Sequence, residues 1–168
     1  MMDRVLTRDR IDGDPMTFDA RRGTRGNRQP NGRLMRWVNS LMTRRVRRSG
    51  GRMMMGLNTL VLTTVGRRSG VERANPLSWF PGPDGSWLVV ASANGAVDNP
   101  AWYYNLAAHP DRARIDVDGD TIEVTAEHLH GADREQAWQE ITTTAPRFAQ
   151  YQRKTDRQLP VIRLTRRS

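Results

Sequence analysis

Residues 60–80 read LVLTTVGRRSGVERANPLSWF, and residues 86–110 read SWLVVASANGAVDNPAWYYNLAAHP. Each stretch begins with an apolar, β-branched run that predicts a buried strand. The first run ends in a tight turn bounded by glycines, residues 66–70 (GRRSG), and the second ends in the small, flexible loop 91–95 (ASANG). Glycine and small residues let a ligand approach the backbone closely. The sequence therefore predicts two strand ends that are suited to binding.

The turn at residues 66–70 favours an anionic ligand. Arg67 and Arg68 place two guanidiniums beside free backbone N–H groups, which suits bidentate capture of a phosphate or carboxylate. Arg73 adds a third cation a few residues later. The alternative is that these arginines are ordinary solvated turn residues. Asn99 as N-cap and Pro100 in the first turn predict the start of a helix. The positive end of that helix can face the same anion.

Strand patterns dominate the remaining chain. Short β-rich runs divided by turn residues predict strands at 58–65, 74–80, 86–92, 114–117, 121–128 and 161–165. Asp-Gly pairs at 84–85 and 118–119 are favourable hairpin turns. Helices are expected at 100–108 and 132–144. Antiparallel strands with two inserted helices indicate an α+β domain with a barrel-like sheet.

Charge and the spacing of apolar residues together divide the chain into three regions. Residues 1–52 contain 14 Arg and 5 Asp, whereas the remaining residues contain 13 basic and 13 acidic side chains. Residues 1–30 have few apolar side chains and are expected to be a disordered basic tail. Apolar residues recur every three or four positions over residues 31–50, which predicts an amphipathic basic helix ended by Gly50 and Gly51. Residues 51–168 are expected to form the folded domain.

Several classes of function are excluded by absent features. The chain has no cysteine, so thiolate catalysis and cysteine-bound zinc are ruled out. It has neither a run of about 18 apolar residues nor a signal-peptide pattern, so a cytoplasmic protein is expected. Dinucleotide and Walker motifs are missing, which argues against NAD and ATP. His128 and His130 alternate along a strand, but no third ligand is evident, so no metal site is expected.

Five motifs in register resemble the deazaflavin-dependent nitroreductase family of actinobacteria. They are TTVGRRSG, ANPLSWF, VVASANG, NPAWYYNL and KTDRQLP, and the resemblance covers roughly residues 53–166. The resemblance implies a split β-barrel of the flavin-reductase or FMN-binding type, with the N-terminal amphipathic helix added to it. It also implies use of reduced coenzyme F420 to reduce quinones and nitro compounds.

The resemblance implies a cofactor site formed by the two loops and the helix start. Trp102 can also be interpreted as a core residue. For Asn105, the pattern favours neither a cofactor role nor a structural one. Relatives often have a lysine where this chain has Ala93, which would weaken the grip on the phosphate. The residues implied to bind the cofactor are Arg67, Arg68, Ser69, Arg73, Ser92, Asn94, Gly95, Asn99, Pro100, Trp102 and Asn105.

A substrate pocket is implied at Ser78, Ala145, Phe148 and Tyr151. The characterised nitroreductase of the family has tyrosines at the positions of Ala145, Phe148 and Tyr151, and relatives often have one at the position of Ser78. Only Tyr151 is retained here. The pocket should therefore be roomier and less polar than in relatives. Tyr151 is the candidate catalytic proton donor. Thr155-Asp156-Arg157 matches a family motif and is interpreted as a structural turn with an ion pair.

The expected function is hydride transfer from reduced F420 to a hydrophobic acceptor such as a quinone or nitro compound. Two alternatives remain: an FMN enzyme on the same barrel, and a non-catalytic F420- or quinone-binding protein. A third alternative is that the basic N-terminal region, including the helix at 31–50, is an arm that binds nucleic acid, because such an arm needs only positive charge. Its apolar stripe favours an anionic membrane surface or packing on the barrel instead, so no nucleic-acid partner is expected.

Overall fold

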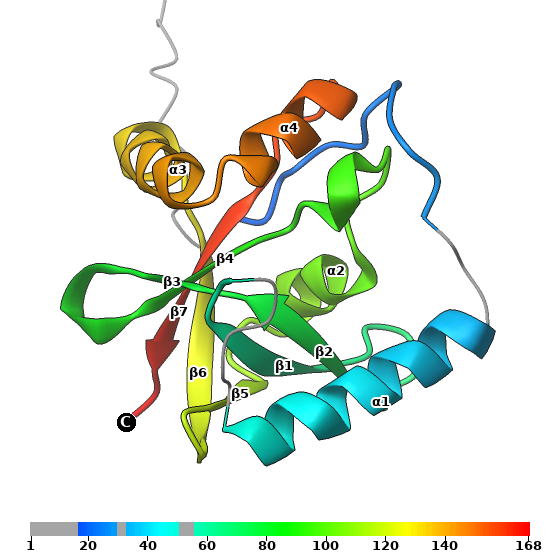
Figure 1. Cartoon of the computed structure of the whole chain (residues 1–168), viewed down its shortest axis with the longest axis vertical. Coiled ribbons are helices and arrows are strands. Elements are labelled where there is room, and N and C mark those ends of the chain that lie inside the picture. Colours follow the sequence, from blue (N-terminus) through cyan, green and yellow to red (C-terminus); the bar gives the residue numbers. More distant parts are fainter. Residues whose placement is uncertain (1–16, 30–32, 51–55) are drawn as a thin grey trace, which may run out of the picture.

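The computed structural model describes residues 17–29, 33–50 and 56–168, and within residues 33–36 the backbone only. Seven strands form one antiparallel sheet in the order β2-β1-β5-β6-β7-β4-β3 (Figure 1). The α+β class and the barrel-like antiparallel sheet are thereby confirmed. The strands are β1 (Thr59–Val65), β2 (Glu72–Ser78), β3 (Phe80–Pro81), β4 (Trp87–Val90), β5 (Ala113–Val117), β6 (Asp120–His128) and β7 (Val161–Arg166).

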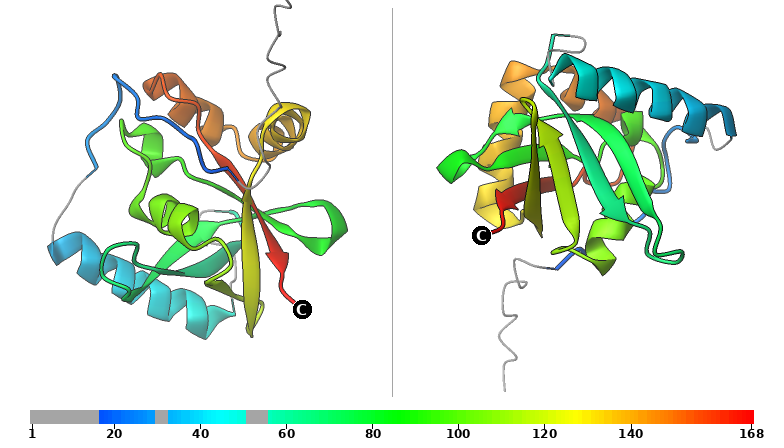
Figure 2. Two further views of the ribbon diagram at one scale, coloured as in Figure 1. Left: turned by 180° about the vertical axis from the view of Figure 1, so that it is seen from behind. Right: turned by 90° about the horizontal axis from the view of Figure 1, so that it is seen from below.

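In the described part of the chain, four helices cover this curved sheet at different places. α1 lies across β1 and β2, while α3 and α4 lie close together at the other end of the molecule (Figure 2). α2 packs on β1, and two short 3₁₀ turns, η1 (Pro83–Gly85) and η2 (Ala93–Gly95), flank β4. The helices are α1 (Arg33–Ser49), α2 (Ala101–Ala108), α3 (Gly131–Thr144) and α4 (Arg147–Lys154).

Two hydrophobic clusters form the core. The first joins β1, β5, β6 and α2 and includes Leu60, Leu106 and Ile115, which are completely buried. Every residue of β1 is buried, including its three threonines, so the strand is covered on both faces. The second joins β4, β7, α3 and α4 around Ile141 and Leu159. The first cluster supports the strand that ends at the arginine turn.

Helix α4 was not expected from the sequence. It has only eight residues, and an isolated helix of that length is unstable in water. Its stability comes from tertiary packing, because Phe148 is buried and meets the ring of Phe80 edge to face at 5.5 Å. Such packing partners lie far away in the sequence and leave no local pattern.

Residues 17–29 form an extended segment, here called the N-terminal strap, that runs beside η2 and the start of α2 (Figure 1). Gly23 N donates to Val97 O at 2.9 Å, and Asn27 forms a parallel bridge with Ala96. The carboxylate of Asp156 accepts hydrogen bonds from the backbone N–H groups of Thr24 and Arg25. The prediction of a disordered tail is therefore wrong for residues 17–29. Residues 1–16 and 30 lie outside the described residues.

The strap also determines how one exposed carboxyl titrates. Hydrogen bonds from the Thr24 side chain and the Arg25 backbone lower the pKa of Asp156 to about 2. These bonds favour the ionised form, which accepts them. Asp156 therefore holds the strap as a carboxylate at neutral pH.

Candidate functional site

A cavity of about 750 Å³ lies between the strap, the start of α2 and the turn at residues 66–70. Its wall is polar and basic. The residues that line it include Arg22, Arg28, Gln29, Arg67, Tyr104 and Asn105. The arginine turn and the helix start, predicted to form one site, do meet at this cavity.

Asn105 fixes the arginine turn to helix α2. Its Oδ1 accepts a hydrogen bond from Arg67 N at 3.1 Å, and its Nδ2 donates to Thr64 Oγ1 at 3.0 Å. Asn105 is buried, so both halves of its amide are satisfied inside the protein. The turn itself is closed by Gly70 N, which donates to Gly66 O at 2.8 Å. Asn105 thus sets the position of Arg67 at the cavity.

The Arg67 guanidinium lies over the ring of Tyr104, 4.8 Å from its centroid. Within the described residues, Arg67 and Arg28 form no ion pair, whereas Arg22 pairs with Asp98 at 2.8 Å. The cavity therefore has positive charge that no acidic side chain of the described residues balances. Such a wall fits a phosphate or another anionic group.

The other predicted members of the arginine turn are not cavity residues. Arg68, Ser69 and Arg73 are exposed, and Arg73 lies on β2, at the edge of the sheet. Ser69 Oγ accepts a hydrogen bond from Val71 N at 3.3 Å, so it stabilises the turn. A cofactor role for these three residues stays a prediction.

The predicted second loop forms η2 and has an unusual backbone. Ala93 and Asn94 have positive φ values of 44° and 55°, which is uncommon outside glycine. Gly95 also has a positive φ, and a Cβ there would lie 2.6 Å from Tyr151 O. Glycine is therefore required at residue 95 for η2 to pack on α4. Ser92 is half-buried and Asn94 is exposed.

The predicted capping role of Asn99 is wrong. Helix α2 begins at Ala101, Pro100 occupies the cap position, and no side chain caps the helix. The buried Asn99 side chain instead donates to Ala20 O at 3.2 Å and accepts from Arg157. Trp102 is buried in the first hydrophobic cluster, in agreement with its interpretation as a core residue.

Arg157 organises the region around η2, and the sequence interpretation missed this role. Its guanidinium donates to four oxygens: Ala96 O at 2.8 Å, Ala91 O at 3.1 Å, Ser92 O at 2.8 Å and Asn99 Oδ1 at 2.7 Å. Arg157 is only 4% exposed, and burial lowers the pKa of its guanidinium. Asp156 binds the strap and Arg157 binds carbonyl and amide oxygens, so both residues have the structural role that was expected of this motif.

The four residues of the predicted substrate pocket lie around α4. Ala145 and Phe148 are buried in the second hydrophobic cluster. Ser78 Oγ accepts a hydrogen bond from Arg147 Nη2 at 3.1 Å. The half-buried Tyr151 ring meets Phe148 edge to face at 5.7 Å. Their role toward a substrate stays a prediction.

Comparisons with known proteins agree on one family. The sequence model of the F420H(2)-dependent quinone reductase family matches residues 34–166. An F420H(2)-dependent quinone reductase of Mycobacterium tuberculosis is 36% identical over 107 residues, which cover 62% of this chain and 70% of that protein.

Solved structures also match this chain. The structure of an F420-H2 dependent reductase (FDR-A) has 33% sequence identity and a TM-score of 0.57, and the match covers 64% of this chain and 93% of that one. A second structure, described as a domain-swapped dimer, has 30% identity and a TM-score of 0.59, with 79% and 99% covered. These structures share the split-barrel architecture.

Proposed function

Because the chain belongs to the F420H(2)-dependent quinone reductase family, we propose that it transfers a hydride from reduced F420 to a quinone. The observation that supports this most directly is the basic cavity at Arg67. F420 has a phosphodiester on a flexible ribityl arm, and charge-assisted hydrogen bonds suit such a group. The residues present therefore fit the cofactor.

The residues of the cavity would hold and orient the cofactor. Arg67 would bind the phosphate, and Asn105 would keep Arg67 in position through the hydrogen bond to its backbone. The small residues of loop 92–95 would let the flat ring system approach the backbone. Reduced F420, when bound, supplies the hydride, so the protein contributes position and exclusion of water.

The acceptor would lie near α4. Tyr151 is half-buried there, and its hydroxyl is the proposed proton donor to the reduced acceptor. Ser78, Ala145 and Phe148 give this region small or apolar side chains, which suits a hydrophobic quinone. Nitro compounds are proposed as secondary acceptors.

The first prediction concerns the cofactor. Titration of the purified protein should give tighter binding of F420 than of FMN. Both cofactors have a ribityl phosphate that the basic cavity could bind, but the chain belongs to a family that uses F420. Fluorescence or absorbance of each cofactor measures the two affinities. Equal or tighter FMN binding would contradict the proposal. Single-turnover oxidation of reduced F420 by a short-chain quinone then separates an enzyme from a non-catalytic binding protein.

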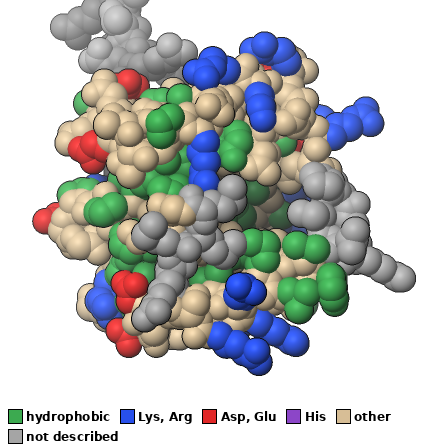
Figure 3. Space-filling model, in the orientation of Figure 1, with side chains coloured by type: hydrophobic (Ala, Val, Ile, Leu, Met, Phe, Trp, Pro, Cys, Tyr) green, Lys and Arg blue, Asp and Glu red, His purple; other side chains and the backbone are tan. Residues whose placement is uncertain are grey.

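A second proposal concerns helix α1 and an anionic membrane surface. Thr43 and Val46 are buried, whereas Trp37 and Leu41 are 61% and 44% exposed. Basic side chains gather over α1 beside hydrophobic ones (Figure 3), and Arg48 is among those exposed. The described helices include none with the length and hydropathy to cross a bilayer. We infer peripheral binding of this face, at the inner surface of a membrane that holds a lipid quinone.

The second prediction tests this membrane proposal. The full chain should sediment with vesicles of phosphatidylglycerol and not with vesicles of phosphatidylcholine, since each basic residue near an anionic surface contributes about 1 kcal/mol. The Trp37→Ser/Leu41→Ser variant should sediment less. Val71→Ser is the matched control, because Val71 is also an exposed hydrophobic residue, 50% exposed, outside α1. Equal loss in both variants would contradict a specific role for α1.

A further inference from the structure

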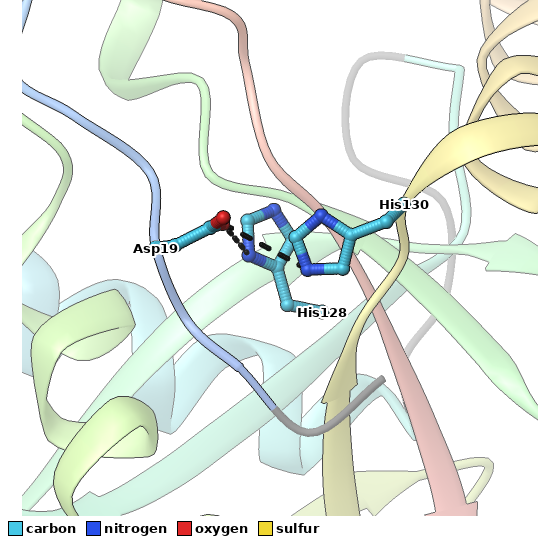
Figure 4. A group of neighbouring side chains, drawn as sticks. All are labelled: Asp19, His128 and His130. Atoms are coloured by element: carbon cyan, nitrogen blue, oxygen red, sulfur yellow. Dashed lines mark ion pairs between the residues drawn. The ribbon is translucent and has the colours of Figure 1, made fainter. Parts of the chain in front are cut away.

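Three potential metal ligands meet where the strap crosses the end of β6 (Figure 4). Asp19 comes from the strap, His128 is the last residue of β6, and His130 immediately precedes α3. Their ligand atoms all lie within 4.8 Å of one another. Asp19 adds a third potential ligand from near the opposite end of the chain, which the sequence around the two histidines does not reveal.

The distances from the Asp19 carboxylate to the two imidazoles fit a shared cation better than direct hydrogen bonds between these residues. Asp19 Oδ1 lies 3.5 Å from His128 Nδ1 and 3.8 Å from His130 Nε2. Both separations are long for a hydrogen bond. Zinc binds histidine nitrogen and carboxylate oxygen at about 2.0–2.2 Å in a tetrahedron, so its ligand atoms stand about 3.3–3.6 Å apart. The two measured separations are close to that spacing.

The cluster is buried on its inner side and open on its outer side. His128 is only 5% exposed, so its ring is shielded from solvent. The two imidazole rings lie 4.3 Å apart. A wall of aromatic rings, Phe18 and Tyr103, closes the inner side. Asp19 is largely exposed, so its side of the cluster is open to solvent.

The alternative is a hydrogen-bonded clamp without metal. His130 Nε2 lies 2.9 Å from Thr17 O, and Tyr103 Oη lies 3.3 Å from His128 Nδ1. Both contacts use the same ring nitrogens that face Asp19, so a bound ion would have to replace them. They would leave the Asp19 carboxylate without a close partner among the ring nitrogens, although it points toward both (Figure 4).

We propose that Asp19, His128 and His130 bind one zinc-class divalent ion that fastens the N-terminal strap to the end of β6. Two imidazoles and one carboxylate suit zinc, whereas calcium and magnesium prefer oxygen ligands alone. With three protein ligands, a fourth position is left for water. Because Arg22 and Arg28 of the strap line the basic cavity, the ion would also hold one wall of that cavity in place.

The decisive experiment titrates the metal-stripped, untagged full chain with Zn²⁺ in a calorimeter. One equivalent should bind. Asp19→Asn and His130→Ala should each weaken Zn²⁺ binding by at least about 10–100-fold. Changes in residues that only support metal ligands already cause losses of about this size, and loss of a ligand should cost no less. His109→Ala is the matched control, because His109 at the end of α2 is not one of the three clustered residues, and this variant should bind Zn²⁺ as the wild type does. Far-ultraviolet circular dichroism verifies that each variant is folded.

Limited trypsin digestion provides a second readout, because the strap contains exposed arginines. Zn²⁺ should slow cleavage within residues 17–29 in the wild type and not in His130→Ala. Absence of a bound equivalent, or equal Zn²⁺ binding by wild type and both ligand variants, would overturn the site. Binding that leaves the cleavage rate of the strap unchanged would overturn its fastening role.

Discussion

Replacement of Arg157 by methionine is expected to lower the free energy of unfolding by about 3–5 kcal/mol. The substitution keeps much of the side-chain volume but removes every donor. Four oxygens around η2, those of Ala91, Ser92, Ala96 and the Asn99 side chain, would lose their hydrogen bonds. Each buried polar atom left without a partner costs about 1–3 kcal/mol, and some will gain water instead. Urea denaturation followed by circular dichroism measures the change.

Arg153→Met is the matched control, since Arg153 is an exposed arginine on the neighbouring helix α4. An exposed substitution of this kind should change stability by no more than about 0.5 kcal/mol. Arg157→Lys should fall between the two, because it keeps the charge but lacks the planar fork that reaches several carbonyls. If Arg157→Met and Arg153→Met unfold at the same urea concentration, the network does not stabilise the protein.

The sequence was most informative where structure is local. The short β-rich run of residues 58–65 predicted a strand, and β1 occupies residues 59–65 and is buried throughout. The strap was misinterpreted because composition shows few apolar residues but not the Asp156 carboxylate that binds the strap from the other end of the chain. Long-range polar contacts of this kind cannot be inferred from local composition.

The same distinction applies to the candidate site. The glycines around Arg67 mark a turn in any sequence, so its position was predictable. Arg157 was not identified because its partners are mostly backbone carbonyls, which every residue possesses and no motif displays. Asn99 has the residue type of a helix cap, but Arg157 and the strap offer its side chain better-placed partners. The residue type of Asn99 indicated a hydrogen-bonding side chain at this position but did not identify its partners.

The other large effect is expected at the arginine turn. Replacement of Arg67 and Arg68 by alanine should weaken F420 binding by about 2–4 kcal/mol, or roughly 30- to 1,000-fold, because each charge-assisted hydrogen bond contributes about 1.5–3 kcal/mol before screening. Arg67→Ala alone should account for most of the loss, since Arg67 lines the cavity and stacks on Tyr104, whereas Arg68 does not line it. Fluorescence titration with F420 measures both single variants and the double variant.

Salt dependence separates a direct phosphate contact from a change in overall charge. Raising the salt concentration should weaken F420 binding by the wild type more than by the double variant, because the variant has lost the charges that salt screens. Arg166→Ala, an exposed arginine at the end of β7, removes charge away from the cavity and should bind F420 as the wild type does. Normal binding by Arg67→Ala would mean that the turn has no role in binding, and the phosphate would then have to be sought at Arg28 on the strap.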